Sequence, residues 1–90
     1  MQGFRPHPTP NPNSLKVTTE AGPFIEGGME SFRSAREAAA HPLAAAVFRV
    51  PGVIDVFILP DFLTVTKAPE CSWETVWPAV EQQLRRHFGG

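Results

Sequence analysis

The chain has 90 residues, enough for one small domain with a modest core, because a domain of this size buries only about two-thirds of its unfolded surface. Hydrophobic residues at 42% and charged residues at 19% are typical of a globular protein and exclude a disordered one. The net charge of −1 argues against a nucleic-acid-binding protein and a polybasic membrane-surface protein, and no apolar run approaches the roughly 20 residues that span a bilayer.

The N-terminal segment is rich in proline, with four of the ten prolines in its first 13 residues. Proline fixes its own φ and shifts the preceding residue toward extended conformations, so this segment is expected to be extended. We expect residues 1–8 to be a flexible lead and residues 9–90 to form a single domain, with residues 9–13 ordered against it. Leu15–Thr19 then alternates apolar and polar residues, which predicts a strand.

The middle of the chain is predicted to hold a second, short strand and a helix. Gly22-Pro23 ends the first strand, and residues 29–32 are the candidate for the second. Ser34 and Glu37 have the spacing of a capping box, which opens a helix. An alanine-rich stretch follows, and Pro42 suits the first position of a fresh helical turn. The apolar stripe of this helix consists of Leu43, Ala46, Val47 and Val50.

A hairpin and a final helix are predicted for the rest of the chain. Residues 53–59 and 62–67 are rich in apolar and β-branched side chains and flank the turn dipeptide Pro60-Asp61. Ser72 is a suitable N-cap for the last helix. The apolar stripe of that helix consists of Trp73, Val76, Trp77, Val80, Leu84 and Phe88. We expect Trp77 to lie in the core against the sheet.

The order of the predicted elements is β-β-α-β-β-α. Antiparallel strands combined with two helices indicate an α+β fold, in this case a two-layer sandwich. We therefore expect a mainly antiparallel sheet with both helices on one face.

The predicted hairpin register separates two faces of the sheet, if Pro60-Asp61 is a two-residue loop. On the face expected to meet the helices, the pairs are Ile58–Leu63, Val56–Val65 and Ile54–Lys67. On the open face, the pairs are Leu59–Phe62, Phe57–Thr64 and Asp55–Thr66. Lys16 of the first strand joins the open face.

The open face holds the candidate partner-binding residues, which are Phe57, Leu59, Phe62 and Lys16. An apolar patch on a solvated face often marks an interaction site. The alternative is that Leu59 and Phe62 tuck under the turn or pack on the N-terminal lead.

Several short motifs stand out along the chain. They are Thr9-Pro10-Asn11-Pro12-Asn13-Ser14-Leu15-Lys16-Val17, His41-Pro42-Leu43-Ala44, Val47-Phe48, Gly52-Val53, Val56-Phe57-Ile58, the stretch 61–67 and Trp73. In this order they resemble the N-terminal domain of the Nfu/NifU-type iron–sulfur cluster scaffold proteins, from about Thr9 to about Phe88. The resemblance implies the same α+β arrangement. It also implies an accessory role in cluster assembly or delivery, in which the domain docks a scaffold, a carrier or an apo-client protein.

The chemistry of cluster binding argues against a cofactor held by this chain itself. In two-domain members of that family a Cys-x-x-Cys in a second domain holds the cluster, whereas Cys71 is the single cysteine here. A cluster usually needs four thiolates, so we expect no metal site, and iron or a cluster only through a partner. His7, His41 and His87 do not have a zinc spacing, and we expect His87 near a helix end to favour its charged form.

Three alternatives remain open at this stage. One is a general protein-interaction domain unrelated to iron, which uses the open face or an edge strand. Another is weak direct binding of iron or a cluster through Cys71 with carboxylates. The third is a small enzyme, which is disfavoured because the sequence has no nucleophile–base constellation and therefore no candidate catalytic residue.

A cytoplasmic location is expected. A single cysteine fits a reducing compartment, and the N-terminus has no hydrophobic secretory core. The expected partner is a protein, with no nucleic acid and no membrane.

Overall fold

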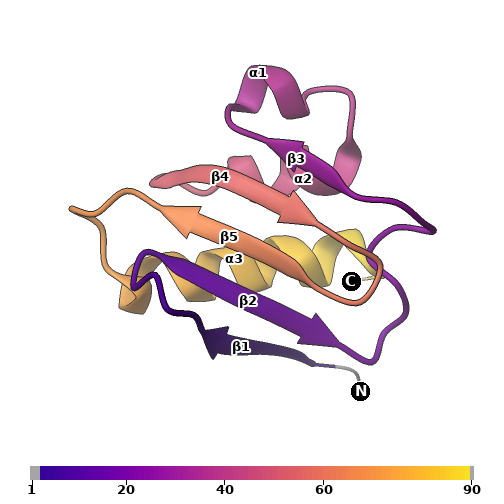
Figure 1. The fold of residues 1–90 in the computed structure, drawn as a ribbon, viewed down its shortest axis with the longest axis horizontal. Helices are drawn as coiled ribbons and strands as arrows, with labels where there is room; N and C mark the ends of the chain where they lie inside the picture. The colour runs from indigo at the N-terminus through magenta and orange to yellow at the C-terminus, as the bar shows by residue number, and fades with distance from the viewer. Residues whose placement is uncertain (1–2, 90) are drawn as a thin grey trace.

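The computed structural model describes residues 3–89, which form a five-stranded sheet with helices packed against it (Figure 1). The strands are β1 (Phe4–Pro8), β2 (Ser14–Thr19), β3 (Glu30–Phe32), β4 (Val53–Ile58) and β5 (Leu63–Lys67). The helices are α1 (Ala35–Ala38), α2 (Pro42–Phe48) and α3 (Trp73–His87). The strand order is β1-β2-β5-β4-β3, and every neighbouring pair is antiparallel. The predicted α+β fold is confirmed.

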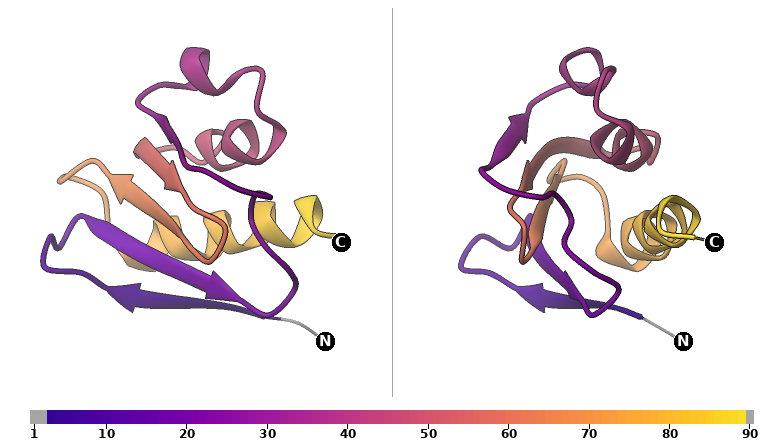
Figure 2. Two further views of the ribbon diagram at one scale, coloured as in Figure 1. Left: turned by 45° about the vertical axis from the view of Figure 1, so that its right-hand side comes forward. Right: turned by 90° about the vertical axis from the view of Figure 1, so that its right-hand side faces the viewer.

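The two longer helices, α2 and α3, lie side by side on one face of the sheet and leave the other face uncovered (Figure 2). The predicted first helix is divided in two, because residues 39–40 form a turn and α2 starts afresh at Pro42. His41 caps this new helix, since its Nδ1 accepts a hydrogen bond from the backbone N–H of Ala44 at 3.3 Å. None of the helices in the described part of the chain has both the length and the apolar character needed to cross a membrane.

The core lies between the sheet and the two longer helices. Its sheet side consists of Val17, Val56, Ile58, Leu63 and Val65. Its helix side consists of Leu43, Val47, Val76, Val80 and Leu84. Trp77, which was expected to lie in the core against the sheet, is half-buried and packs against the border of this core. A tryptophan is large enough that its indole extends past a small interface, so it is rarely covered completely.

The β4–β5 hairpin has the predicted register except at its open end. The confirmed pairs are Val56–Val65, Phe57–Thr64, Ile58–Leu63 and Asp55–Thr66. A bulge between Val53 and Asp55 shifts the last pair, so that Lys67 lies opposite Val53 and not opposite Ile54. The extra residue leaves the ladder, and Ile54 is 47% exposed. The prediction that Ile54 faces the helices was therefore wrong.

β1 is an edge strand that the sequence did not reveal. Residues 4–8 were expected to belong to a flexible lead, but they pair with β2 along their whole length. The two prolines of β1 lack an N–H group, which an edge strand tolerates because only one of its sides is paired. Phe4 holds the strand in place, since it is buried and its ring centroid lies 5.7 Å from that of Phe88, the C-cap of α3. The sheet therefore includes residues that were expected to precede the domain.

Candidate partner-binding surface

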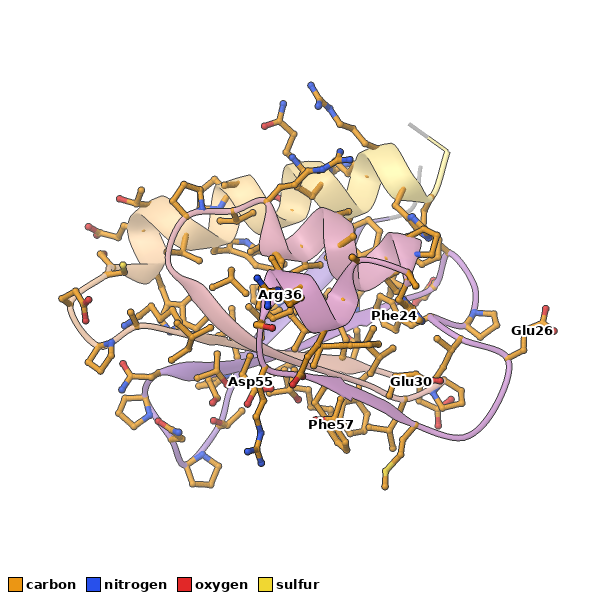
Figure 3. The ribbon with its side chains drawn as sticks, turned by 90° about the horizontal axis from the view of Figure 1, so that it is seen from above. Phe24, Glu26, Glu30, Arg36, Asp55 and Phe57 are labelled. Atoms are coloured by element: carbon orange, nitrogen blue, oxygen red, sulfur yellow. The ribbon has the colours of Figure 1, made fainter. Side chains whose placement is uncertain are left out.

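The uncovered face of the sheet carries the predicted binding residues. Side chains of a strand alternate between the two faces, so Phe57 points away from the helices between the buried Val56 and Ile58. Figure 3 shows Phe57 on the side of the sheet opposite to the helical layer. Thr64 lies opposite Phe57 on one side and opposite Lys16 on the other, so these three residues form one cross-strand row.

Direct contacts bring Leu59, Phe62 and Lys16 to the same end of the hairpin. The backbone N–H of Leu59 donates to the carbonyl oxygen of Phe62 at 2.8 Å, which closes the turn. The Nζ of Lys16 lies 4.7 Å from the centre of the Phe62 ring, within the range of a cation–π interaction. Phe57, Leu59 and Phe62 are all half-buried, so none of them belongs to the core. We call Phe57, Leu59, Phe62 and Lys16 the aromatic patch.

The β3 edge extends the aromatic patch with residues that the sequence did not single out. Ser31 lies opposite Phe57 across the β3–β4 ladder. Met29 directly precedes β3 and, at 66% exposure, is the most exposed large apolar side chain among residues 3–89. A three-residue strand has too short a pattern to predict its partner. The only sequence signal for this extension was the apolar Met29, which lies between Gly28 and Glu30.

A basic flank lies beside the aromatic patch on β1 and β2. Arg5 lies opposite Thr18, and His7 lies opposite Lys16. The Nε2 of His7 is 2.8 Å from the Oγ1 of Thr18, which fixes the imidazole over this face. Asp55, farther along β4, is an acidic residue of the same face. The β1 and β2 side of the aromatic patch is therefore basic, whereas Glu30, Asp55 and Asp61 place carboxylates along β3, β4 and the turn.

The proline-rich motif forms a loop that is anchored to β5 and α3. Lys67 is 6% exposed, and its Nζ donates to the Oδ1 of Asn13 at 2.9 Å. The indole N–H of Trp73 donates to the carbonyl oxygen of Pro12 at 3.0 Å. A buried ammonium group requires such partners, because it has left water. These contacts join three separate sequence motifs and give them a structural role at the end of the sheet.

Cys71 lies in a confined site next to Gly52. A Cβ atom on residue 52 would lie 2.8 Å from the Sγ of Cys71, and the φ of Gly52 is +97°. Both facts favour glycine at this position. Among residues 3–89, no group of three or more His, Cys, Asp or Glu side chains is arranged to hold a metal ion. The expectation that the chain ligates no cluster stays a prediction.

The pKa of His87 shifts in the direction opposite to the one expected from its place at the helix end. Burial lowers the pKa of His87 below its ordinary value, and the positive charge of nearby His41 lowers it further. The expectation that the helix C-terminus favours the charged imidazole was therefore wrong.

Two relatives of known sequence are similar to most of this chain. It is 42% identical over 81 residues to the human protein "NFU1 iron-sulfur cluster scaffold homolog, mitochondrial", a match that covers 89% of this chain and 32% of that protein. It is 40% identical over 72 residues to "NifU-like protein 5, mitochondrial" of Arabidopsis thaliana, which covers 80% of this chain and 26% of that protein. The chain thus spans about a third or less of the length of these relatives.

Solved structures and a family profile agree with this relationship. The fold is similar to a crystal structure of a Staphylococcus aureus protein, with a TM-score of 0.77, 26% identity, and coverage of 93% of this chain and 99% of that one. It is also similar to a solution structure of a NifU-like protein from Saccharomyces cerevisiae, with a TM-score of 0.76, 26% identity, and coverage of 92% and 75%. The profile of the family described as "Scaffold protein Nfu/NifU N terminal" matches residues 5–90. The chain therefore belongs to the Nfu/NifU N-terminal family, which is a scaffold-protein family and not a known family of enzymes.

Proposed function

We propose that this domain is an accessory binding module of iron–sulfur cluster assembly or delivery, which docks a scaffold, carrier or apo-client protein without itself ligating the cluster. The observation that carries the proposal is the aromatic patch, which lies on the sheet face opposite to both longer helices. Because the chain belongs to the scaffold-protein family, we seek the partner among proteins of iron–sulfur cluster assembly and delivery.

The composition of the surface favours a protein partner of defined chemistry. Half-buried aromatic side chains such as Phe57 and Phe62 lose little conformational freedom on binding, and such anchors often carry much of an interface's energy. The basic flank beside them would orient a partner that surrounds an apolar contact with carboxylates. The proposed partner is therefore a cluster-handling protein with an acidic rim around an apolar site.

The cluster itself belongs to the partner in this proposal. Cys71 is the one thiol of the chain, and a cluster usually takes four. A cytoplasmic location is also part of the proposal, although the names of the two relatives above place those proteins in mitochondria. Fractionation of source cells with an antibody to this chain tests the location.

The binding test begins with affinity capture from an extract of the source cells, and the captured cluster-handling protein is then purified and titrated. Phe57→Ala is expected to weaken its affinity at least tenfold, which corresponds to about 1.4 kcal/mol or more. Adding Lys16→Glu should weaken binding further if the partner is acidic there. Ile54→Ala, which truncates an exposed apolar side chain of the same strand outside the patch, is the matched control and should stay within twofold.

Other outcomes of this titration decide between the alternatives. Equal affinity of the wild type and Phe57→Ala would contradict the aromatic patch as the site and direct attention to the loop over residues 9–14. Captured partners that handle no clusters would favour a general interaction domain.

A second experiment tests the absence of direct ligation. Anaerobic reconstitution of the isolated domain with iron and sulfide is expected to give no stable chromophore. Stoichiometric bound iron that is lost in Cys71→Ala would instead support direct binding through this cysteine.

A further inference from the structure

A cleft of about 360 Å³ opens between α2 and α3, in the helical layer that lies on the opposite side of the sheet from the aromatic patch. From α2 and its C-cap it is lined by Pro42, Ala45, Ala46 and Arg49. From α3 it is lined by Gln83, Arg86 and His87. Both sets have the i, i+3 and i+4 spacings of a single helix face, so the two helices each turn one stripe toward the cleft.

The size of the cleft follows from short side chains on α2. Ala45 and Ala46 are half-buried between the helices and reach only one carbon from the backbone. Longer residues at these two positions would fill the space. These short side chains therefore leave room in the cleft for a group of several heavy atoms.

The charge of the cleft is positive and is not balanced from within. Among the described residues that line it, none is acidic, whereas Arg49, Arg86 and His87 are basic. Within residues 3–89 neither Arg49 nor Arg86 has an ion pair, although the adjacent Arg85 pairs with Glu81 at 3.1 Å. The cleft therefore presents positive charge that no acidic side chain of its lining offsets.

Helix ends offer a simpler reason for some of these charges. Arg49 is the C-cap of α2, and Arg86 and His87 lie in the last turn of α3, where cations stabilise the negative end of the helix dipole. That effect explains the sign of the charge. It does not explain why the cations of two helices line the same cleft. Arg85 also lies in the last turn of α3 and can stabilise the helix dipole, but it forms an ion pair with Glu81.

We propose that this cleft binds a small oxyanion with two or more negative charges, a phosphate or a polycarboxylate, between Arg49 and Arg86. A planar guanidinium group donates two parallel hydrogen bonds to such oxygens, and two of them can neutralise a dianion. The amide of Gln83 can donate a further hydrogen bond. The site is independent of the aromatic patch and of the partner proposed for it.

His87 gives this proposal an internal reporter. An anion held in the cleft that His87 lines places a negative charge near the imidazole and offsets the repulsion from His41, so the pKa of His87 should rise when the cleft is occupied. The imidazole C–H resonances of His87, followed against pH with and without anion, measure this change directly.

The experiment is a titration of the isotope-labelled domain with inorganic phosphate and with citrate at constant ionic strength, followed by two-dimensional amide NMR. Saturable shifts are expected at the lining residues of α2 and α3. The double variant Arg49→Gln with Arg86→Gln should weaken binding at least tenfold. Arg5→Gln removes a positive charge of the same kind on the opposite sheet face, and it should keep the affinity within twofold.

A variant that fills the cleft distinguishes anion binding inside the cleft from binding to a diffuse basic surface. Ala46→Met keeps every charge but occupies the cleft, so it should also weaken binding at least fivefold, with a thermal melt to confirm that it folds. Saturation by phosphate alone or by citrate alone supports the proposal and identifies the kind of anion. Shifts equal to those caused by sodium chloride, or unchanged affinity in the double arginine variant or in a folded Ala46→Met, would overturn it.

Discussion

The two faces of the β4–β5 hairpin differ in burial, because the helices cover one of them and leave the other uncovered. The face toward the helices consists of Val56, Ile58, Leu63 and Val65, all with 0% exposure. The opposite face carries Phe57, which Figure 3 shows on the side away from the helical layer, and Leu59 and Phe62 alternate with the buried Ile58 and Leu63; all three are half-buried. Strict alternation along each strand keeps these two sets apart. Substitutions on one face should therefore change stability, and substitutions on the other should change binding.

The largest effect is expected from a truncation on the covered face. Leu63→Ala removes a fully buried side chain that packs between the sheet and the helices, and it should cost about 2–5 kcal/mol of unfolding free energy. Urea denaturation followed by tryptophan fluorescence measures this change. A loss below about 1 kcal/mol would show that the helical layer does not depend on this contact.

A smaller loss is expected where the proline-rich loop meets the sheet. Lys67→Met keeps the buried alkyl chain but removes the donor to Asn13, so it should cost about 1–3 kcal/mol. Lys16→Met is the matched control, because Lys16 is exposed and its ring contact should contribute about 1 kcal/mol or less. Equal losses in both variants, measured by urea denaturation, would argue against a structural role of the Lys67–Asn13 bond.

The uncovered face should contribute less to stability. Phe57→Ala removes a half-buried ring, and it should cost about 1–1.5 kcal/mol, roughly half of the energy of full burial. The comparison with Leu63→Ala in the same urea titration sharpens the contrast between the faces. If Phe57→Ala destabilises the domain as much as Leu63→Ala does, Phe57 supports the fold and the contrast fails.

The smallest effect is a pH dependence in the helical layer. Because the pKa of His87 is lowered in the folded state, the unfolded chain binds more protons just below about pH 6.5. Folding stability should therefore fall as the pH decreases through this window, and His87→Gln should remove part of that fall. Melting temperatures of the two proteins between about pH 5.5 and 7.5 test the difference. Parallel curves would contradict a contribution from His87.

Local signals in the sequence were sufficient for much of the structure and for part of the candidate surface. The alternation around Phe57 predicted its strand and its face, because a period of two is a property of the backbone and needs no distant partner. Ser34 and Ser72 marked helix starts, and both accept the expected backbone hydrogen bonds. The aromatic patch could be predicted for the same reason, since its apolar members belong to one hairpin.

Contacts between distant segments could not be predicted in the same way. β1 has a proline-rich sequence that is atypical of a strand, and it is held by pairing with β2 and by the contact of Phe4 with Phe88. The bulge that exposes Ile54 depends on how β4 fits against β5. Ser31 lies beside Phe57 only through the pairing of β3 with β4.

The sequence by itself determined the α+β class, the hairpin register at its turn and the family, because each depends on short-range patterns and ordered motifs. Tertiary structure alone decided the extent of the sheet, the anchoring of the loop by Lys67 and the meeting of Arg49 with Arg86 in one cleft. The physical reason is that strand pairing and helix packing bring together residues far apart in the chain, and no local periodicity records which of them will meet.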